Sequence, residues 1–142
     1  MKTTPIIDRL KDQVAAFGAR VAGTASLEGA AETDLAVPHA FVLALGDHAE
    51  PDALLGTATV QTVTETFRVI VCVANTSDER GQTAADRIDD LRAQILAALI
   101  GFGADGRYSR IEYLGGDFVD LDRARLWWQF DLAGITSSDL IA

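Results

Sequence analysis

The segment from Thr59 to Ala74, TVQTVTETFRVIVCVA, constrains the fold of this chain more than any other. Its first half alternates threonines with other side chains, and its second half, residues 69–74, is apolar throughout. Alternation is typical of a strand with one solvent face, and continuous apolarity of a strand buried on both faces. We therefore predict one long strand with a central C-terminal half and an N-terminal arm around residues 57–66. A strand arm is marginal alone and is expected to pair with a neighbour.

Two amphipathic helices are predicted, one before and one after this strand. The first covers TTPIIDRLKDQVAAFG, in which Pro5 suits the first helical turn and Gly18 is placed to end the helix. The second begins after Ser77 with acidic residues, which favour a helix N-terminus, and runs to about Ile100. Apolar residues recur at three and four positions in both, so each helix has one buried face. These residues are Ile7, Leu10, Val14 and Phe17 in the first helix and Ala84, Ile88, Leu91, Ile95, Ala98, Leu99 and Phe102 in the second.

Three further strands complete the predicted sheet. His39–Leu45 is a short apolar run, and Ile111–Val119 and Ala124–Leu132 form a C-terminal hairpin. The pair Gly115–Gly116 predicts a bulge or bend within that hairpin. The predicted class is α+β, with a mainly antiparallel sheet of about four strands and two long helices packed on one face.

The chain length and net charge limit the classes of function that this protein can have. A chain of 142 residues is typical of one domain, and we expect a single domain over residues 1–142 with a short flexible C-terminus at 135–142. A net charge of −9 disfavours binding to nucleic acid and to anionic membranes, which both require clustered Lys and Arg. The single cysteine, Cys72, excludes an internal disulfide and a cysteine-based zinc site, and suits a reducing compartment. No apolar run reaches the length of a signal peptide or a transmembrane helix.

The candidate chemical groups do not form a catalytic, cofactor or metal site. His48–Asp52 offers one imidazole and two carboxylates, which is too few at defined spacing for a metal. Cys72 lies in an apolar strand, where a thiol behaves as a small hydrophobe. The glycine-rich run at 101–106 follows a helix, so it lacks the helix N-terminus that binds phosphate. The carboxylates Asp117, Asp120 and Asp122 suit a turn better than a general acid–base pair.

Two adjacent tryptophans in the last strand must point to opposite faces of the sheet. Trp128 is in phase with Leu126 and Phe130, which makes it the core residue. Trp127 is in phase with Arg125 and Gln129, on the more polar face. Two placements are open for Trp127: an outward contact with another subunit, or packing under a nearby helix.

Two stretches, QTVTETFRVIVCVAN at 61–75 and YLGGDFVDLDRARLWWQFDL at 113–132, resemble a known family. The order Gly-Gly, Leu-Asp, Leu-Trp-Trp-Gln in the second is similar to the C-terminal signature of phage tail terminator proteins from long-tailed phages and prophages. The resemblance extends from about Ile6 to Leu132. It implies a small α/β subunit, without enzymatic activity or cofactor, in a hexameric ring of the virion tail, assembled in the host cytoplasm. Such a ring caps the tail-tube protein, ends tube growth and meets the head-completion proteins, while DNA passes through its lumen.

Strand phase and the projecting arm predict where the subunits of such a ring would meet. The expected contact residues are Trp127, Arg125 and Gln129 on the hairpin and Thr62 and Thr64 on the arm. Two other functions stay open: another head–tail connector or tail-tube subunit, and a small α/β ligand-binding or enzymatic domain with residues 46–57 as a lid. An enzyme would bring polar groups together in a pocket, and the sequence indicates no such group.

Overall fold

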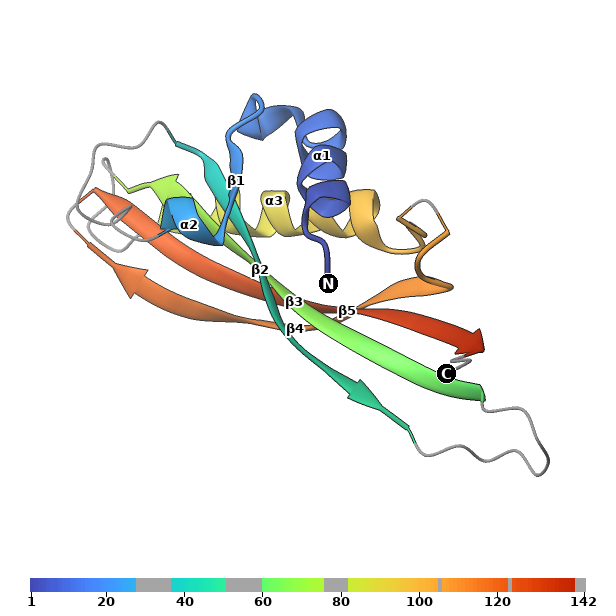
Figure 1. Ribbon diagram of the computed structural model, residues 1–142. Helices are drawn as coiled ribbons and strands as arrows, with labels where there is room; N and C mark the ends of the chain where they lie inside the picture. The colour runs from blue at the N-terminus through green and yellow to red at the C-terminus, as the bar shows by residue number, and fades with distance from the viewer. Residues whose placement is uncertain (28–36, 51–59, 76–81, 105, 123, 140–142) are drawn as a thin grey trace.

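A mixed five-stranded sheet with the order β1-β2-β3-β5-β4 forms the centre of the fold (Figure 1). β1 pairs with β2 in parallel, and the other three pairings are antiparallel. The α+β class and the mainly antiparallel sheet are therefore confirmed, with five strands instead of about four. The computed structural model describes residues 1–27, 37–50, 60–75, 82–104, 106–122 and 124–139. The strands are β1 (Val21–Gly23), β2 (His39–Ala49), β3 (Val60–Ala74), β4 (Arg110–Leu121) and β5 (Arg125–Asp139).

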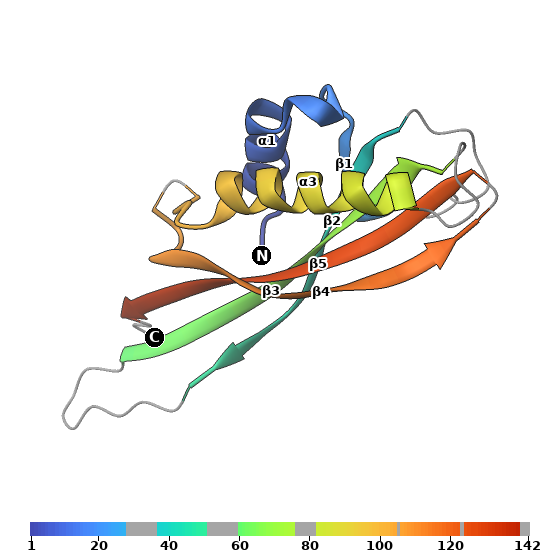
Figure 2. The same cartoon turned by 180° about the vertical axis from the view of Figure 1, so that it is seen from behind.

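The helices lie on both faces of this sheet. α3 (Gln82–Leu99) runs along one face, here called the helix face, and α1 (Thr4–Gln13) packs against α3 and β1. The short helix α2 (Thr24–Leu27) lies on the other face, here called the opposite face, as Figures 1 and 2 show from the two sides. The first predicted helix ends at Gln13, a 3-10 turn follows, and Gly18 takes the left-handed conformation with φ of 52°. Two long helices therefore pack on one side as predicted, and α2 is an addition.

The main core lies between the helix face and the helices α1 and α3. The helical stripes read from the sequence enter this core, since Leu10, Val14 and Phe17 of the first segment are fully buried there. The sheet contributes alternate residues of its central strands, because successive side chains of a strand point to opposite faces. Those residues are Val69, Val71, Val73, Leu126, Phe130 and Leu132.

The predicted arm has three strands. β3 begins at Val60 and pairs on one side with β2, which continues to Ala49, and on the other with β5, which continues to Asp139. Backbone N–H and C=O groups in a projecting strand need partners, and these extensions supply them. Residues 46–49, which belong to the segment considered as a lid, and residues 135–139 of the expected C-terminus are thus strand. Residues 51–59 and 140–142 lie outside the described residues.

The hairpin of β4 and β5 contains the predicted irregularity. The register shifts between Tyr113 and Gly115, directly at the glycine pair, and again between Phe118 and Asp120. Gly115 has φ of 149°, a conformation that side-chain-bearing residues rarely adopt. The bulge expected from Gly115–Gly116 is therefore confirmed.

Candidate subunit interface

Trp127, one of the expected subunit contacts, is buried within the subunit. Its side chain is 5% exposed and forms a second cluster with Phe41 and Cys72 on the opposite face. The Phe41 and Trp127 rings stack with centroids 6.3 Å apart and planes 20° apart. Leu27 of α2 packs against this cluster. Of the two placements left open by the sequence, the structure therefore shows the one under a helix.

Asp122 and Arg125 hold the indole in place. The Trp127 Nε1–H donates to Asp122 Oδ2 over 3.3 Å, and the Arg125 guanidinium lies 5.3 Å from the indole ring centroid. Asp122 also accepts the backbone N–H groups of Ala124 and Arg125 and pairs with the Arg125 side chain. Burial alone would raise the pKa of Asp122, but these hydrogen bonds and the Arg125 charge hold it below its usual value. The carboxylate thus serves the turn, as the sequence suggested.

The other predicted contact residues share the opposite face but form no single patch. Arg125 and Gln129 lie beside the Trp127 cluster, and both are half-buried. Thr62 and Thr64, also half-buried, lie on the arm. Arg125 pairs with Ala74, which is ten residues from Thr64 along β3, or ~33 Å at the usual rise of a strand. The structure therefore divides these residues into a hairpin group and an arm group.

Glu65 connects the arm to the rest of the subunit through hydrogen bonds. Its carboxylate accepts a 2.7 Å hydrogen bond from the Tyr108 hydroxyl and a 3.0 Å bond from Arg107, both in the loop between α3 and β4. Burial opposes ionisation of Glu65, but these two donors and the Arg107 charge together lower its pKa. Burial and the Glu65 contact raise the pKa of Tyr108. The base of the arm is therefore held by a charged hydrogen-bond network.

The folded state lowers the pKa of Glu65. Its carboxylate therefore stabilises the folded protein at pH values above the ordinary pKa of 4.5. That contribution is lost as the pH falls through the lower folded pKa. We expect Glu65→Gln, which cannot ionise, to show a flatter decline in unfolding free energy below pH 4.5 than the wild type. Urea unfolding at several pH values measures this. Parallel declines of the two proteins would contradict a role for Glu65.

The β4 strand presents an apolar edge that the sequence reasoning did not identify. Phe118 is 55% exposed, Val119 is 43% exposed, and Leu114 and Leu121 are similarly open. β4 is the last strand of the sheet, and within the described part of the chain no strand pairs with its outer side. A long apolar edge strand is a template for pairing with another chain. The available signal was the apolar run Phe118-Val119, which breaks the strand alternation beside Leu121.

A shallow groove adjoins this edge on the helix face. It has a volume of about 280 Å³ and lies between α3 and the β4–β5 hairpin. Trp128, Phe130 and Tyr113 form its floor, and Phe118 meets Trp128 edge-on with ring centroids 6.3 Å apart. Trp128 is therefore partly covered core, as predicted, but one side of it faces this groove.

The described residues contain no group of side chains that could hold a metal ion. His48 contacts Glu50 at 3.3 Å, and both are solvent-exposed; residues 51–52 of the suspected ligand set lie outside the described ranges. Burial raises the pKa of the Cys72 thiol to about 12, which removes its nucleophilic form at neutral pH. Among the helices that the structure describes, none is long and apolar enough to cross a membrane.

Comparison with known protein families shows to which family this chain belongs. The family described as phage tail terminator protein matches residues 1–133, which include α1, α3 and most of the sheet. No curated protein matches the chain. The resemblance read from the Gly-Gly and Trp-Trp-Gln segments is thus confirmed. This is a family of structural proteins of the phage tail and not of enzymes. The chain therefore belongs to the phage tail terminator family and is a structural component of the virion tail.

Proposed function

We propose that this protein forms a hexameric ring that caps the tail tube, ends its polymerisation and joins the tail to the head-completion proteins. The observation that carries this proposal is the family match, which spans nearly the whole fold. Ring formation needs surfaces that extend beyond one subunit. The three-stranded arm and the apolar β4 edge are such surfaces.

The charge of the subunit supports its place at the head–tail junction. With a net charge of −9, a ring of these subunits repels the phosphate backbone of DNA that passes through its lumen. Passage without binding is what a conduit requires. In this proposal DNA is therefore a transient occupant, and the stable partners are other copies, the tube protein and a head-completion protein.

Two groups of side chains are proposed to face neighbouring subunits. Arg125 and Gln129 form the hairpin group, and Thr62 and Thr64 form the arm group. Trp127 takes part indirectly, because it packs beneath the Arg125 guanidinium and fixes its position. Polar, half-buried residues of this kind suit the rim of an interface.

A mass measurement in solution tests the ring, and tube growth tests the cap. We expect light scattering to give about six times the chain mass of 15.1 kDa, either for the protein alone or after it meets tail tubes. Added to polymerising tube protein, it should shorten the tubes seen by electron microscopy and occupy one end of each. Tube protein polymerised alone is the control. A strict monomer that leaves tube length unchanged would overturn the proposal.

A further inference from the structure

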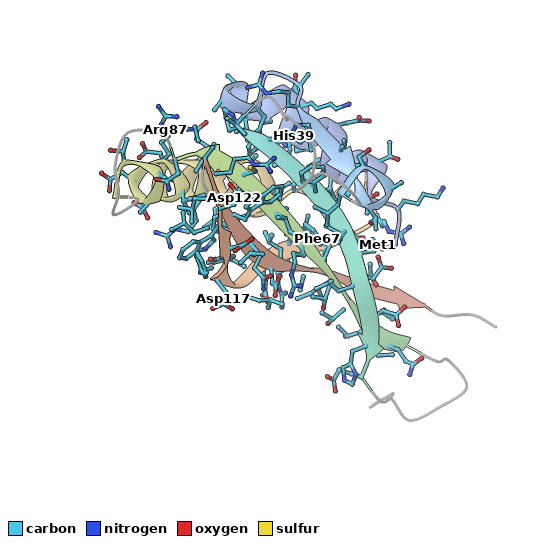
Figure 3. All side chains as sticks on the ribbon, turned by 90° about the vertical axis from the view of Figure 1, so that its left-hand side faces the viewer. Met1, His39, Phe67, Arg87, Asp117 and Asp122 are labelled. Carbon is cyan, nitrogen blue, oxygen red and sulfur yellow. The ribbon has the colours of Figure 1, made fainter. Side chains whose placement is uncertain are left out.

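Two free strand edges lie at opposite sides of the sheet. The outer edge of β4 is unpaired in the described chain, as noted above. On the other side, β1 covers only Ala40–Val42 of β2, so no described strand pairs with the outer edge of β2 from Leu43 to Ala49. Figure 3 shows the separation, because Asp117 of β4 lies on the side of the sheet away from β2. In the described chain, each subunit thus has a free β4 edge on one side of the sheet and a free β2 edge on the other.

The strand directions make these edges complementary between copies. Three successive antiparallel pairings, from β2 through β3 and β5 to β4, leave β4 antiparallel to β2. We infer that the free edge of β2, residues 43–49, pairs antiparallel with the β4 edge, residues 114–121, of a second copy of this chain. This inference rests on the ring proposed above and assigns its subunit contact. Such a head-to-tail contact uses two different surfaces, and repetition with a closing rotation produces a ring.

The proposed pairing would bring polar side chains of the two edges together on defined faces of the sheet. A continuous sheet would place Asp47 of one copy on the helix face of its neighbour, where the groove beside Phe118 carries Arg92 in an ion pair with Asp89. The next residue, His48, would lie on the opposite face beside Asp117 and Asp120. His48 is charged only when protonated, and in that form it would attract the two carboxylates. Opposite charges across an interface favour the correct partner and register.

The apolar residues add the required burial. Leu114, Phe118, Val119 and Leu121 are each 43–57% exposed along one strand, and large apolar residues exposed together mark contact sites. A stable interface buries ~800 Å² on each partner. The arm backbone, Leu45 and the groove supply further area. In this contact the β4 edge therefore supplies the apolar centre, and the arm and the groove surround it.

The offset between the two edges fits a closed ring. Asp47 is level with Glu65, Gly134 and Ile111 across the sheet, whereas Phe118, which lies on the same face, is level with Trp128. Gly134 and Trp128 are six residues apart, so the edges are displaced by ~20 Å along the strands. Four strands span ~19 Å across the sheet. These lengths imply strands tilted by ~45° to the ring axis, at the upper end of the range of ~35–45° found when sheets close on themselves.

Site-directed cross-linking of the full chain tests this contact. The double variant His48→Cys, Val119→Cys is treated with a short bismaleimide and separated by denaturing electrophoresis, with tail tubes present if the protein is monomeric alone. We expect a ladder of linked chains up to six, and no linked chains from either single variant. Cys72 does not compete because it is fully buried. The matched control is His48→Cys, Ile100→Cys, since Ile100 is 47% exposed but lies at the end of α3, and it should give no ladder.

The outcomes separate this inference from the proposed function. A hexamer by mass without a ladder would overturn the β2–β4 contact and leave the ring intact. Linked dimers from Val119→Cys alone would show that two β4 edges meet about a two-fold axis, which also overturns it. A protein that is monomeric both alone and with tubes would overturn the ring and the contact together.

Discussion

Replacing Trp127 by alanine is expected to lower the free energy of unfolding by about 3–5 kcal/mol, as for other buried large aromatics. The indole is 5% exposed, stacks on Phe41 and lies over the fully buried Cys72. Its removal leaves a cavity beneath α2 and also leaves Asp122 without one of its donors. Urea unfolding followed by far-ultraviolet circular dichroism measures the loss, at a concentration where both proteins have the same oligomeric state.

Two neighbouring substitutions control this experiment. Trp128→Ala is expected to cost less, because Trp128 is only partly covered and borders the groove beside Phe118. Trp127→Phe preserves most of the volume and is expected to fall between wild type and Trp127→Ala. If Trp127→Ala weakened ring assembly while unfolding changed by less than about 1 kcal/mol, Trp127 would be an interface anchor after all.

Gly134→Ala is the second substitution with a large expected effect, at about 1–3 kcal/mol of destabilisation. A Cβ on Gly134 would lie 2.7 Å from Cε1 of Tyr108, which is closer than two non-bonded carbon atoms approach in proteins. The ring cannot withdraw easily, because it is buried and its hydroxyl donates to Glu65. The added methyl group must therefore displace the ring or break the tie at the base of the arm. Chemical denaturation measures the difference.

Gly46→Ala is the matched control for this change. Gly46 also lies in the arm, but no atom comes within 4 Å of its Cβ position, so a change within about 0.5 kcal/mol is expected. Combining Gly134→Ala with Tyr108→Leu should cost less than the sum of the two single changes, because the smaller side chain removes the clash. Strict additivity of the two, or an unchanged stability of Gly134→Ala, would show that the Tyr108 ring does not restrain this position.

Much of the fold was predictable because it depends on periodicity within single segments. The alternation in residues 59–66 and the apolar run after it predicted the long strand and its projecting end. Helical spacing predicted α1 and α3, and the Gly115–Gly116 pair predicted the bulge. The β2 extension, at Gly46–Ala49, was missed because these residues show no alternation. Strand formation there depends on pairing with β3.

The candidate interface was less predictable, because it depends on contacts between distant segments. Strand phase correctly separated Trp127 from Trp128, but phase says nothing about what covers a face. Leu27, a hundred residues earlier in the chain, contributes to the cover of Trp127. The exposure of Phe118 and Val119 depends on β4 being the last strand of the sheet, which no local pattern records.

The sequence by itself determined the segments and the family, because side-chain spacing and the Gly-Gly and Trp-Trp-Gln signature are properties of short stretches. The tertiary structure alone decided which strand edges stay open and which aromatics are covered. Those properties arise from contacts between distant segments, such as the pairing of Val60 with Asp139 and of Gly46 with Thr66. Such contacts are selected by the burial and hydrogen bonding of the whole sheet, which no single segment contains.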